Sequence, residues 1–135
     1  MYEIIKNGWI AGACPLMRPV KATKSNTFKI LERVMFATTR LGGSCIITVP
    51  CGFISDLNSI PRVLPLGFHS NSASGAAVLH DFMYRRAEYR KPGVTRKIAD
   101  LIYRDAMKDN GVRRITAYTY YSFVRLFGWR HYANA

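Results

Sequence analysis

The distribution of hydrophobic and polar residues divides the chain into a β-rich half and a helical half. Residues 1–55 contain runs of β-branched and aromatic residues, which are typical of strands. Residues 56–73 follow neither a period of two nor one of 3.6 and predict an irregular loop, whereas residues 74–135 show helical spacing. The pattern predicts one α+β domain over residues 1–135, with a small N-terminal antiparallel β-sheet followed by about three α-helices.

Two strands and a turn stand out in the β-rich half. Residues 28–37 and 44–49 are rich in β-branched and aromatic residues, and Leu41-Gly42-Gly43 lies between them. Because a short glycine-containing turn joins adjacent antiparallel strands, we expect a hairpin here.

The helical half predicts helices over residues 75–90, 96–109 and 115–127. The first two are preceded by a hydroxyl side chain and followed by a glycine or proline, which are the usual start and stop signals of a helix. These signals are Ser72 or Ser74 with Pro92-Gly93 for the first helix, and Thr95 with Gly111 for the second. The short connection predicts that these two helices pack as an antiparallel pair.

The composition is that of a globular protein. Of the 135 residues 49% are hydrophobic, which is too many for a disordered chain, and no run reaches the ~20 apolar residues that span a bilayer. The first residues lack a basic stretch followed by an apolar run, so no secretion signal is expected. Cys14, Cys45 and Cys51 form an odd set without a Cys-x-x-Cys pair, and a reducing compartment such as bacterial cytoplasm is expected.

The charge is strongly positive and uneven along the chain. Lysine and arginine number 20 against 8 aspartates and glutamates, a net charge of +12, and residues 85–130 hold 12 basic and 4 acidic residues. Such a surface attracts polyanions, among them nucleic acid, phospholipid headgroups or an acidic protein. A non-specific solubilising field is the alternative explanation.

The residues best suited to proton transfer are His80, Tyr84 and Asp100. On a helix His80 and Tyr84 share one face, whereas Asp81 is turned by about 100° from His80. If the two helices pack antiparallel, Asp100 can reach the imidazole of His80. A carboxylate that holds one ring nitrogen fixes the tautomer of a general base and stabilises the imidazolium. The alternative is a purely structural His–Asp pair that ties the two helices together.

Two further carboxylates, Asp81 and Asp56, are candidate metal ligands. Asp81 adjoins the predicted base, and Asp56 lies in a loop bracketed by Pro50 and Pro61 from which it could reach the helix pair. One histidine with two or three carboxylates suits a hard divalent cation such as calcium. The alternative for Asp56 is a turn cap made by side-chain-to-backbone hydrogen bonds.

The sequence His80-Asp81-Phe82-Met83-Tyr84, followed by Arg96-x-x-Ala99-Asp100, resembles the paired helices of phospholipase A2, especially the short form of viral capsids. In that family the helical histidine activates water, the carboxylate beside it binds calcium, and the aspartate of the second helix orients the histidine. The resemblance implies these roles for His80, Asp81 and Asp100, with Tyr84 supporting Asp100. It covers the region of residues 76–110.

A second resemblance extends over nearly the whole chain. Four blocks carry it, at residues 49–62, 77–81, 99–107 and 124–130. Together they resemble the domain of unknown function 1353, a family found mainly in tailed bacteriophages and prophages. This resemblance implies a bacteriophage protein in the host bacterial cytoplasm, either free or assembled into the virion, and implies no particular activity.

The last predicted helix and the residues after it mix arginines with aromatic residues. The apolar run over residues 115–127 is too short to span a membrane but suits a helix that lies at an interface. The same mixture suits a phospholipid surface, single-stranded nucleic acid or contacts with other virion proteins. The alternative is a core helix packed on the sheet.

These features predict a small bacteriophage hydrolase that acts on a phospholipid ester. His80, Asp100 and Tyr84 would be its catalytic residues, and Asp81 and Asp56 would hold a divalent cation such as calcium. The alternative is a non-enzymatic virion or tail-associated component, in which the same cluster is structural. A third reading is a phage factor that binds host nucleic acid or protein.

Overall fold

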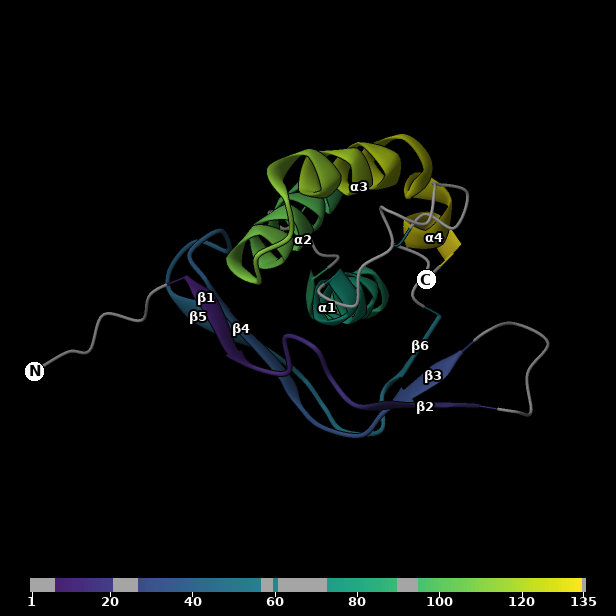
Figure 1. Ribbon diagram of the computed structural model, residues 1–135. Helices are drawn as coiled ribbons and strands as arrows, with labels where there is room; N and C mark the ends of the chain where they lie inside the picture. Colours follow the sequence, from purple (N-terminus) through teal and green to yellow (C-terminus); the bar gives the residue numbers. More distant parts are fainter. Residues whose placement is uncertain (1–6, 21–26, 57–59, 61–72, 90–94, 135) are drawn as a thin grey trace, which may run out of the picture.

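The chain forms two small antiparallel sheets followed by a group of helices, as Figure 1 shows. The computed structural model describes residues 7–20, 27–56, 60, 73–89 and 95–134. The predicted α+β class is confirmed, because the antiparallel strands come first and the helices follow. Most of the expected loop over residues 56–73 lies outside the described residues.

Within the described ranges, each sheet has three strands. One sheet has the order β1–β4–β5 and the other has the order β2–β3–β6, and every pairing is antiparallel. The strands are β1 (Gly8–Ala11), β2 (Met17–Pro19), β3 (Phe28–Ile30), β4 (Val34–Thr38), β5 (Cys45–Val49) and β6 (Ile54–Ser55).

The predicted hairpin is formed by β4 and β5. Val34 lies opposite Val49 and Phe36 lies opposite Ile47, and all four side chains are buried. Because side chains alternate along a strand, these residues share the face that packs against the core. The hairpin prediction is therefore confirmed.

The single strand expected over residues 28–37 is divided in two. Its first part is β3 and its last part begins β4, and these strands belong to different sheets. Leu31, Glu32 and Arg33 between them are exposed and not part of either strand. The prediction of β structure was right for both ends of the segment, but the prediction of one continuous strand was wrong. The strand is interrupted where the chain passes from one sheet to the other.

The helices of the described chain are α1 (Ser74–Arg85), α2 (Arg96–Asp109), α3 (Arg114–Phe127) and the short α4 (Trp129–Asn134). A 3-10 turn at Ala87–Tyr89 follows α1. None of these helices combines the length and the hydropathy that crossing a membrane would require.

The boundaries of α2 agree with its start and stop signals. The Thr95 hydroxyl accepts a hydrogen bond from the backbone N–H of Ile98 at 3.3 Å, as an N-cap does. Gly111, with a φ of +79°, follows the C-cap residue Asn110. A glycine adopts this left-handed conformation without strain, so it ends the helix.

The boundaries of α1 differ from the prediction. The N-cap is Ala73, which makes no side-chain cap, and Ser74 is the first helical residue. The helix ends at Arg85, before the expected residue 90, because the backbone of Arg86 is extended. The other expected signals, Ser72 and Pro92-Gly93, lie outside the described residues.

Helix α1 is the centre of the core. Figure 1 shows it between the sheets on one side and the other helices on the opposite side. Ten of its 12 residues are buried. A Cβ on Gly75 would lie 2.3 Å from the carbonyl oxygen of Ala13, so the close approach of α1 to the preceding backbone requires a glycine.

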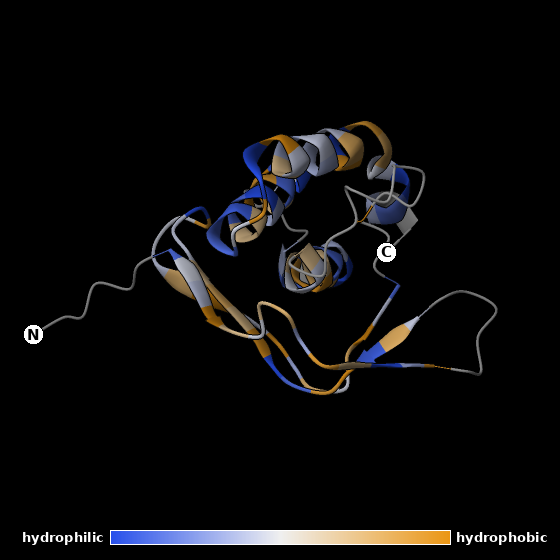
Figure 2. Ribbon diagram, in the orientation of Figure 1, coloured by the Kyte–Doolittle hydropathy of each residue, from blue (hydrophilic) through white to orange (hydrophobic). Residues whose placement is uncertain are grey.

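Helix α3 packs on α2, on the side away from the sheets (Figure 1). Its buried residues are Thr116, Ala117, Tyr120 and Val124, whereas several large apolar side chains face outward. Figure 2 shows that hydrophobic residues gather at the C-terminal end of this helix. It is therefore an amphipathic helix rather than one that is buried on all sides.

Candidate functional site

The centre of the candidate site is the contact between α1 and α2. The Nε2 atom of His80 lies 2.7 Å from Oδ1 of Asp100, and the hydroxyl of Tyr84 donates to the same oxygen at 2.5 Å. His80 and Tyr84 lie four positions apart on α1, which places them on one face. The structure thus brings together the three residues that the sequence suggested for catalysis.

Two arginines hold the second oxygen of Asp100. Arg125 donates to Oδ2 at 2.7 Å and Arg96 donates to it at 3.3 Å. Arg96 also donates to the carbonyl oxygens of Val124 and Arg125 at 2.9 and 3.1 Å. These carbonyls belong to the last turn of α3. Because His80 and Tyr84 of α1 and Arg125 of α3 all contact Asp100 of α2, the carboxylate links the three helices.

The environment of Asp100 keeps its carboxyl group ionised. Its side chain is fully buried and that of His80 is 2% exposed. Burial alone would raise the pKa of Asp100, but the hydrogen bond and charge of His80 and the hydrogen bonds of Tyr84 and Arg125 together lower it. An ionised carboxylate can only accept, so Nε2 of His80 carries a hydrogen. In the neutral imidazole Nδ1 then carries the lone pair.

Aromatic rings fix the orientation of the imidazole. The ring centroid of His80 lies 4.1 Å from that of Tyr84 and 4.8 Å from that of Tyr103. Tyr132 of α4 packs edge-on against Tyr84 at 5.1 Å. Burial, followed by the charge of Asp100, raises the pKa of Tyr84, so its hydroxyl remains a donor.

Asp81 and Asp56 come together around a different partner, Arg85. The Nε atom of Arg85 lies 3.0 Å from Oδ1 of Asp81, and another guanidinium nitrogen lies 3.6 Å from Oδ2 of Asp56. The same guanidinium donates to the carbonyl oxygen of Ile54 at 3.1 Å. The expected proximity of Asp56 to the helix pair is therefore found, on the side of Asp81.

The two carboxylate oxygens of Asp81 differ in their surroundings. Its Oδ2 atom is buried and has no hydrogen-bond partner within the part of the chain that is described. Burial raises the pKa of Asp81, and the charge of Arg85 offsets this only in part.

The described residues do not by themselves fit a calcium site. Among them there is no group of three or more His, Cys, Asp or Glu side chains placed to hold a metal ion. The cation between Asp81 and Asp56 is the guanidinium of Arg85, and Nε2 of His80 is engaged by Asp100. Metal binding by Asp81 and Asp56 stays a prediction.

The arginines of the site were not predicted, although two of them had a signal in the sequence. Arg96 precedes Asp100 by four positions and Arg85 follows Asp81 by four, which is the spacing of helical ion pairs. Arg125 had no such signal, because it lies on another helix.

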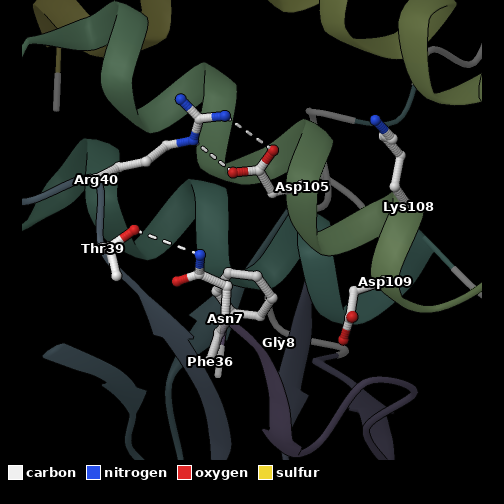
Figure 3. Close-up of a pocket in the computed structure, with 8 residues that line it drawn as sticks. All are labelled: Asn7, Gly8, Phe36, Thr39, Arg40, Asp105, Lys108 and Asp109. Carbon is white, nitrogen blue, oxygen red and sulfur yellow. Dashed lines mark hydrogen bonds and ion pairs between the residues drawn. The ribbon is translucent and has the colours of Figure 1, made fainter. Parts of the chain in front are cut away.

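A separate pocket lies between the start of β1, the end of β4 and the C-terminal half of α2 (Figure 3). Its lining residues are Asn7, Gly8, Phe36, Thr39, Arg40, Asp105, Lys108 and Asp109. Arg40 is paired with Asp105, and Asp109 accepts a hydrogen bond from the backbone N–H of Trp9. These contacts fasten α2 to the sheet, and the pocket shares no residue with the His80–Asp100 cluster.

Comparisons with known proteins identify the family of the chain. A search of curated proteins and a search of solved structures each found no significant match. A family model described as a protein of unknown function, DUF1353, matches residues 28–124. The match covers well over half of the chain and includes both helices of the candidate site. The chain therefore belongs to the DUF1353 family of proteins of unknown function.

Proposed function

We propose that this protein is a small hydrolase that uses His80 as a general base, with a phospholipid ester as its substrate. The observation that supports the proposal most is the 2.7 Å contact between Nε2 of His80 and the buried carboxylate of Asp100. A single contact of this kind can be structural, but Asp100 is also held by Tyr84, Arg96 and Arg125. Such support fixes the position of the carboxylate and hence the tautomer of the imidazole.

In the proposed reaction, Nδ1 of His80 takes a proton from a water molecule as the water oxygen attacks the ester carbonyl carbon. The resulting imidazolium is stabilised by the charge of Asp100. The ester C–O bond then breaks, and the imidazolium returns the proton to the leaving alkoxide. The products are a fatty acid and a lysophospholipid. Tyr84 acts as a positioning residue, since it contacts Asp100 rather than the reacting atoms.

The test compares the full-length protein with His80→Asn on vesicles of mixed phosphatidylcholine and phosphatidylglycerol, with fatty-acid release as the readout. We expect the variant to be at least about 100-fold slower, because general-base catalysis contributes roughly 10²–10⁴-fold. His131→Asn is the matched control, since His131 lies exposed on α4, and it should retain full activity. Parallel assays with calcium and with a chelator test the cation predicted at Asp81 and Asp56.

Equal background release by wild type and His80→Asn in both conditions would refute the proposal. Circular dichroism of each variant shows whether the loss of activity is a loss of folding.

The second candidate is a virion or tail-associated component without enzymatic activity. It is favoured by the burial of His80 and Asp100 and by the way Asp100 joins three helices, both of which suit a structural role. Under this candidate, His80→Asn lowers stability and no activity is found in any condition. Mass spectrometry of purified particles of a phage that encodes the chain would detect it, and its absence from particles would exclude this candidate.

A further inference from the structure

The C-terminal helices carry a group of exposed apolar side chains, here called the C-terminal face. Leu126, Phe127 and Trp129 are 67%, 57% and 53% exposed and follow one another at the junction of α3 and α4. Ile115 and Tyr118 are also exposed. At about 100° per residue Ile115 lies about 20° from Leu126 around the axis of α3, and Tyr118 lies about 80° from it. Leaving large apolar groups together in water is unfavourable, so such a patch marks an interaction surface.

The charged side chains of residues 111–135, which include the C-terminal face, are all arginines. From residue 111 to the end the sequence contains four arginines and no aspartate or glutamate. Arg113, Arg114 and Arg130 are exposed, and the guanidinium of Arg130 lies 5.3 Å from the ring centroid of Trp129. Exposed apolar and aromatic side chains flanked by arginines are the pattern of an element that lies on an anionic bilayer.

The C-terminal face is connected to the candidate site through Arg125. This residue directly precedes Leu126 on α3, and its guanidinium binds the buried Oδ2 of Asp100. On α4, Tyr132 packs against Tyr84, which binds the other oxygen of Asp100. A surface that covers the C-terminal face therefore lies against the elements that hold the His80–Asp100 pair.

We infer that the C-terminal face docks on a bilayer of anionic phospholipid. The inference deepens the proposed function by naming the lipid surface on which the hydrolase works. It rests on the proposed function only for the reason why the protein would bind a bilayer. The binding itself needs no catalysis. His80→Asn should therefore bind vesicles as wild type does, whether or not wild type releases fatty acid.

The first test is co-sedimentation of the full-length protein with phosphatidylglycerol vesicles and with phosphatidylcholine vesicles. We expect binding to phosphatidylglycerol that weakens in about 0.5 M NaCl, because the Debye length falls from about 30 Å in 0.01 M salt to roughly 4 Å. Leu126→Ser with Phe127→Ser should weaken this binding about tenfold or more, because two large side chains no longer enter the bilayer. Ile10→Ser with Leu16→Ser is the matched control, since these residues are 50% and 67% exposed near the sheets.

The second test compares two double variants that each remove two arginines, one pair at the C-terminal face and the other among the strands. Arg114→Gln with Arg130→Gln should weaken binding about 25-fold, because each arginine at an anionic surface contributes roughly fivefold. Arg18→Gln with Arg33→Gln lowers the net charge equally but lies among the strands, and it should have a much smaller effect.

Three results would overturn the inference. The first is no binding of wild type to phosphatidylglycerol vesicles, and the second is equal loss in the patch variants and their controls. The third is a wild-type dimer in sedimentation velocity that Leu126→Ser with Phe127→Ser converts to a monomer, without any vesicle binding. That result would assign the C-terminal face to contacts between copies of the chain.

Discussion

At the scale of single residues, Asp100 accounts for most of the electrostatics of the interior. One carboxylate with no exposure to solvent receives hydrogen bonds from His80, Tyr84, Arg96 and Arg125. Removing one partner from a buried ion pair leaves the other charge without compensation, which is more costly than never having had the pair.

Asp100→Asn should therefore lower the free energy of unfolding by about 3–5 kcal/mol, because two guanidinium groups lose their counter-charge. Urea unfolding followed by circular dichroism measures this change. Asp105→Asn is the control: it breaks the partly exposed pair with Arg40 and should cost about 1 kcal/mol or less. Equal losses in the two variants would show that the buried cluster contributes no more than a surface pair.

The lowered pKa of Asp100 also predicts a pH dependence. Since the folded pKa lies below the ordinary value of 3.8, the ionised group stabilises the fold fully above that value. This contribution is lost as the pH falls through the lowered pKa. Unfolding of wild type and Asp100→Asn over a series of acidic pH values should give a stability difference that shrinks only below the ordinary carboxyl range.

Asp81 provides the opposite sign in the same experiment. Burial raises its pKa, so its ionised form opposes folding above the raised value and ceases to do so as the pH falls to 3.8. The stability of Asp81→Asn relative to wild type should therefore decline toward acid rather than rise. A parallel response of the two variants would contradict the assigned directions.

Helical spacing was enough to predict part of the site. It placed His80 and Tyr84 on one face, and the short connection between helices predicted that Asp100 would reach them. Arg125 could not be predicted, because its contact with Asp100 depends on how α3 packs over α2. Long-range packing of this kind leaves no periodic signal in the sequence.

At the scale of elements, the start of α1 is limited by close packing. A Cβ on Gly75 would meet the carbonyl oxygens of Gly12 and Ala13 at 2.5 and 2.3 Å, and backbone atoms cannot move aside as a flexible side chain can. The close packing of α1 on the backbone of residues 12–13 therefore depends on this one residue.

Gly75→Ala should destabilise the protein by about 1–3 kcal/mol, as overpacking in a core does. Thermal unfolding measures the shift. Gly43→Ala is the matched control, because nothing lies within 4 Å of a Cβ there, and it should have little effect. An unchanged unfolding temperature for Gly75→Ala would mean that the backbone at residues 12–13 yields easily.

The elements that were predicted best are those with local signals at both ends. Thr95 and Gly111 set the limits of α2 through a cap and a left-handed glycine, and both act within a few residues. The run over residues 28–37 was predicted as one strand, but its division depends on which sheet each part joins. That choice is made by distant partners, β1 and β5 for one part and β2 and β6 for the other.

At the scale of the whole molecule, α1 is the element around which the others pack. It contacts α2, both sheets and α4. Backbone amides in such an element exchange only when much of the molecule opens.

Hydrogen exchange measured by mass spectrometry should show the slowest exchange in α1. Helix α3 is a useful comparison, because it is of similar length but has only four buried residues against ten in α1. Faster exchange in α1 than in α3 would contradict the central role of this helix.

Arg96 of α2 binds carbonyl oxygens of α3, and Arg125 of α3 binds Asp100 of α2. These reciprocal contacts have a practical consequence for the design of shorter fragments. The family match ends at residue 124, one position before Arg125. A fragment that ends at residue 124 would lack the guanidinium of Arg125 that binds Asp100 and the carbonyl oxygen of Arg125 that Arg96 binds. It would also lack Tyr132, which packs against Tyr84. The eleven residues after the match thus include parts of the candidate site, and proteolytic cleavage near residue 124 would disturb an imidazole more than forty positions earlier.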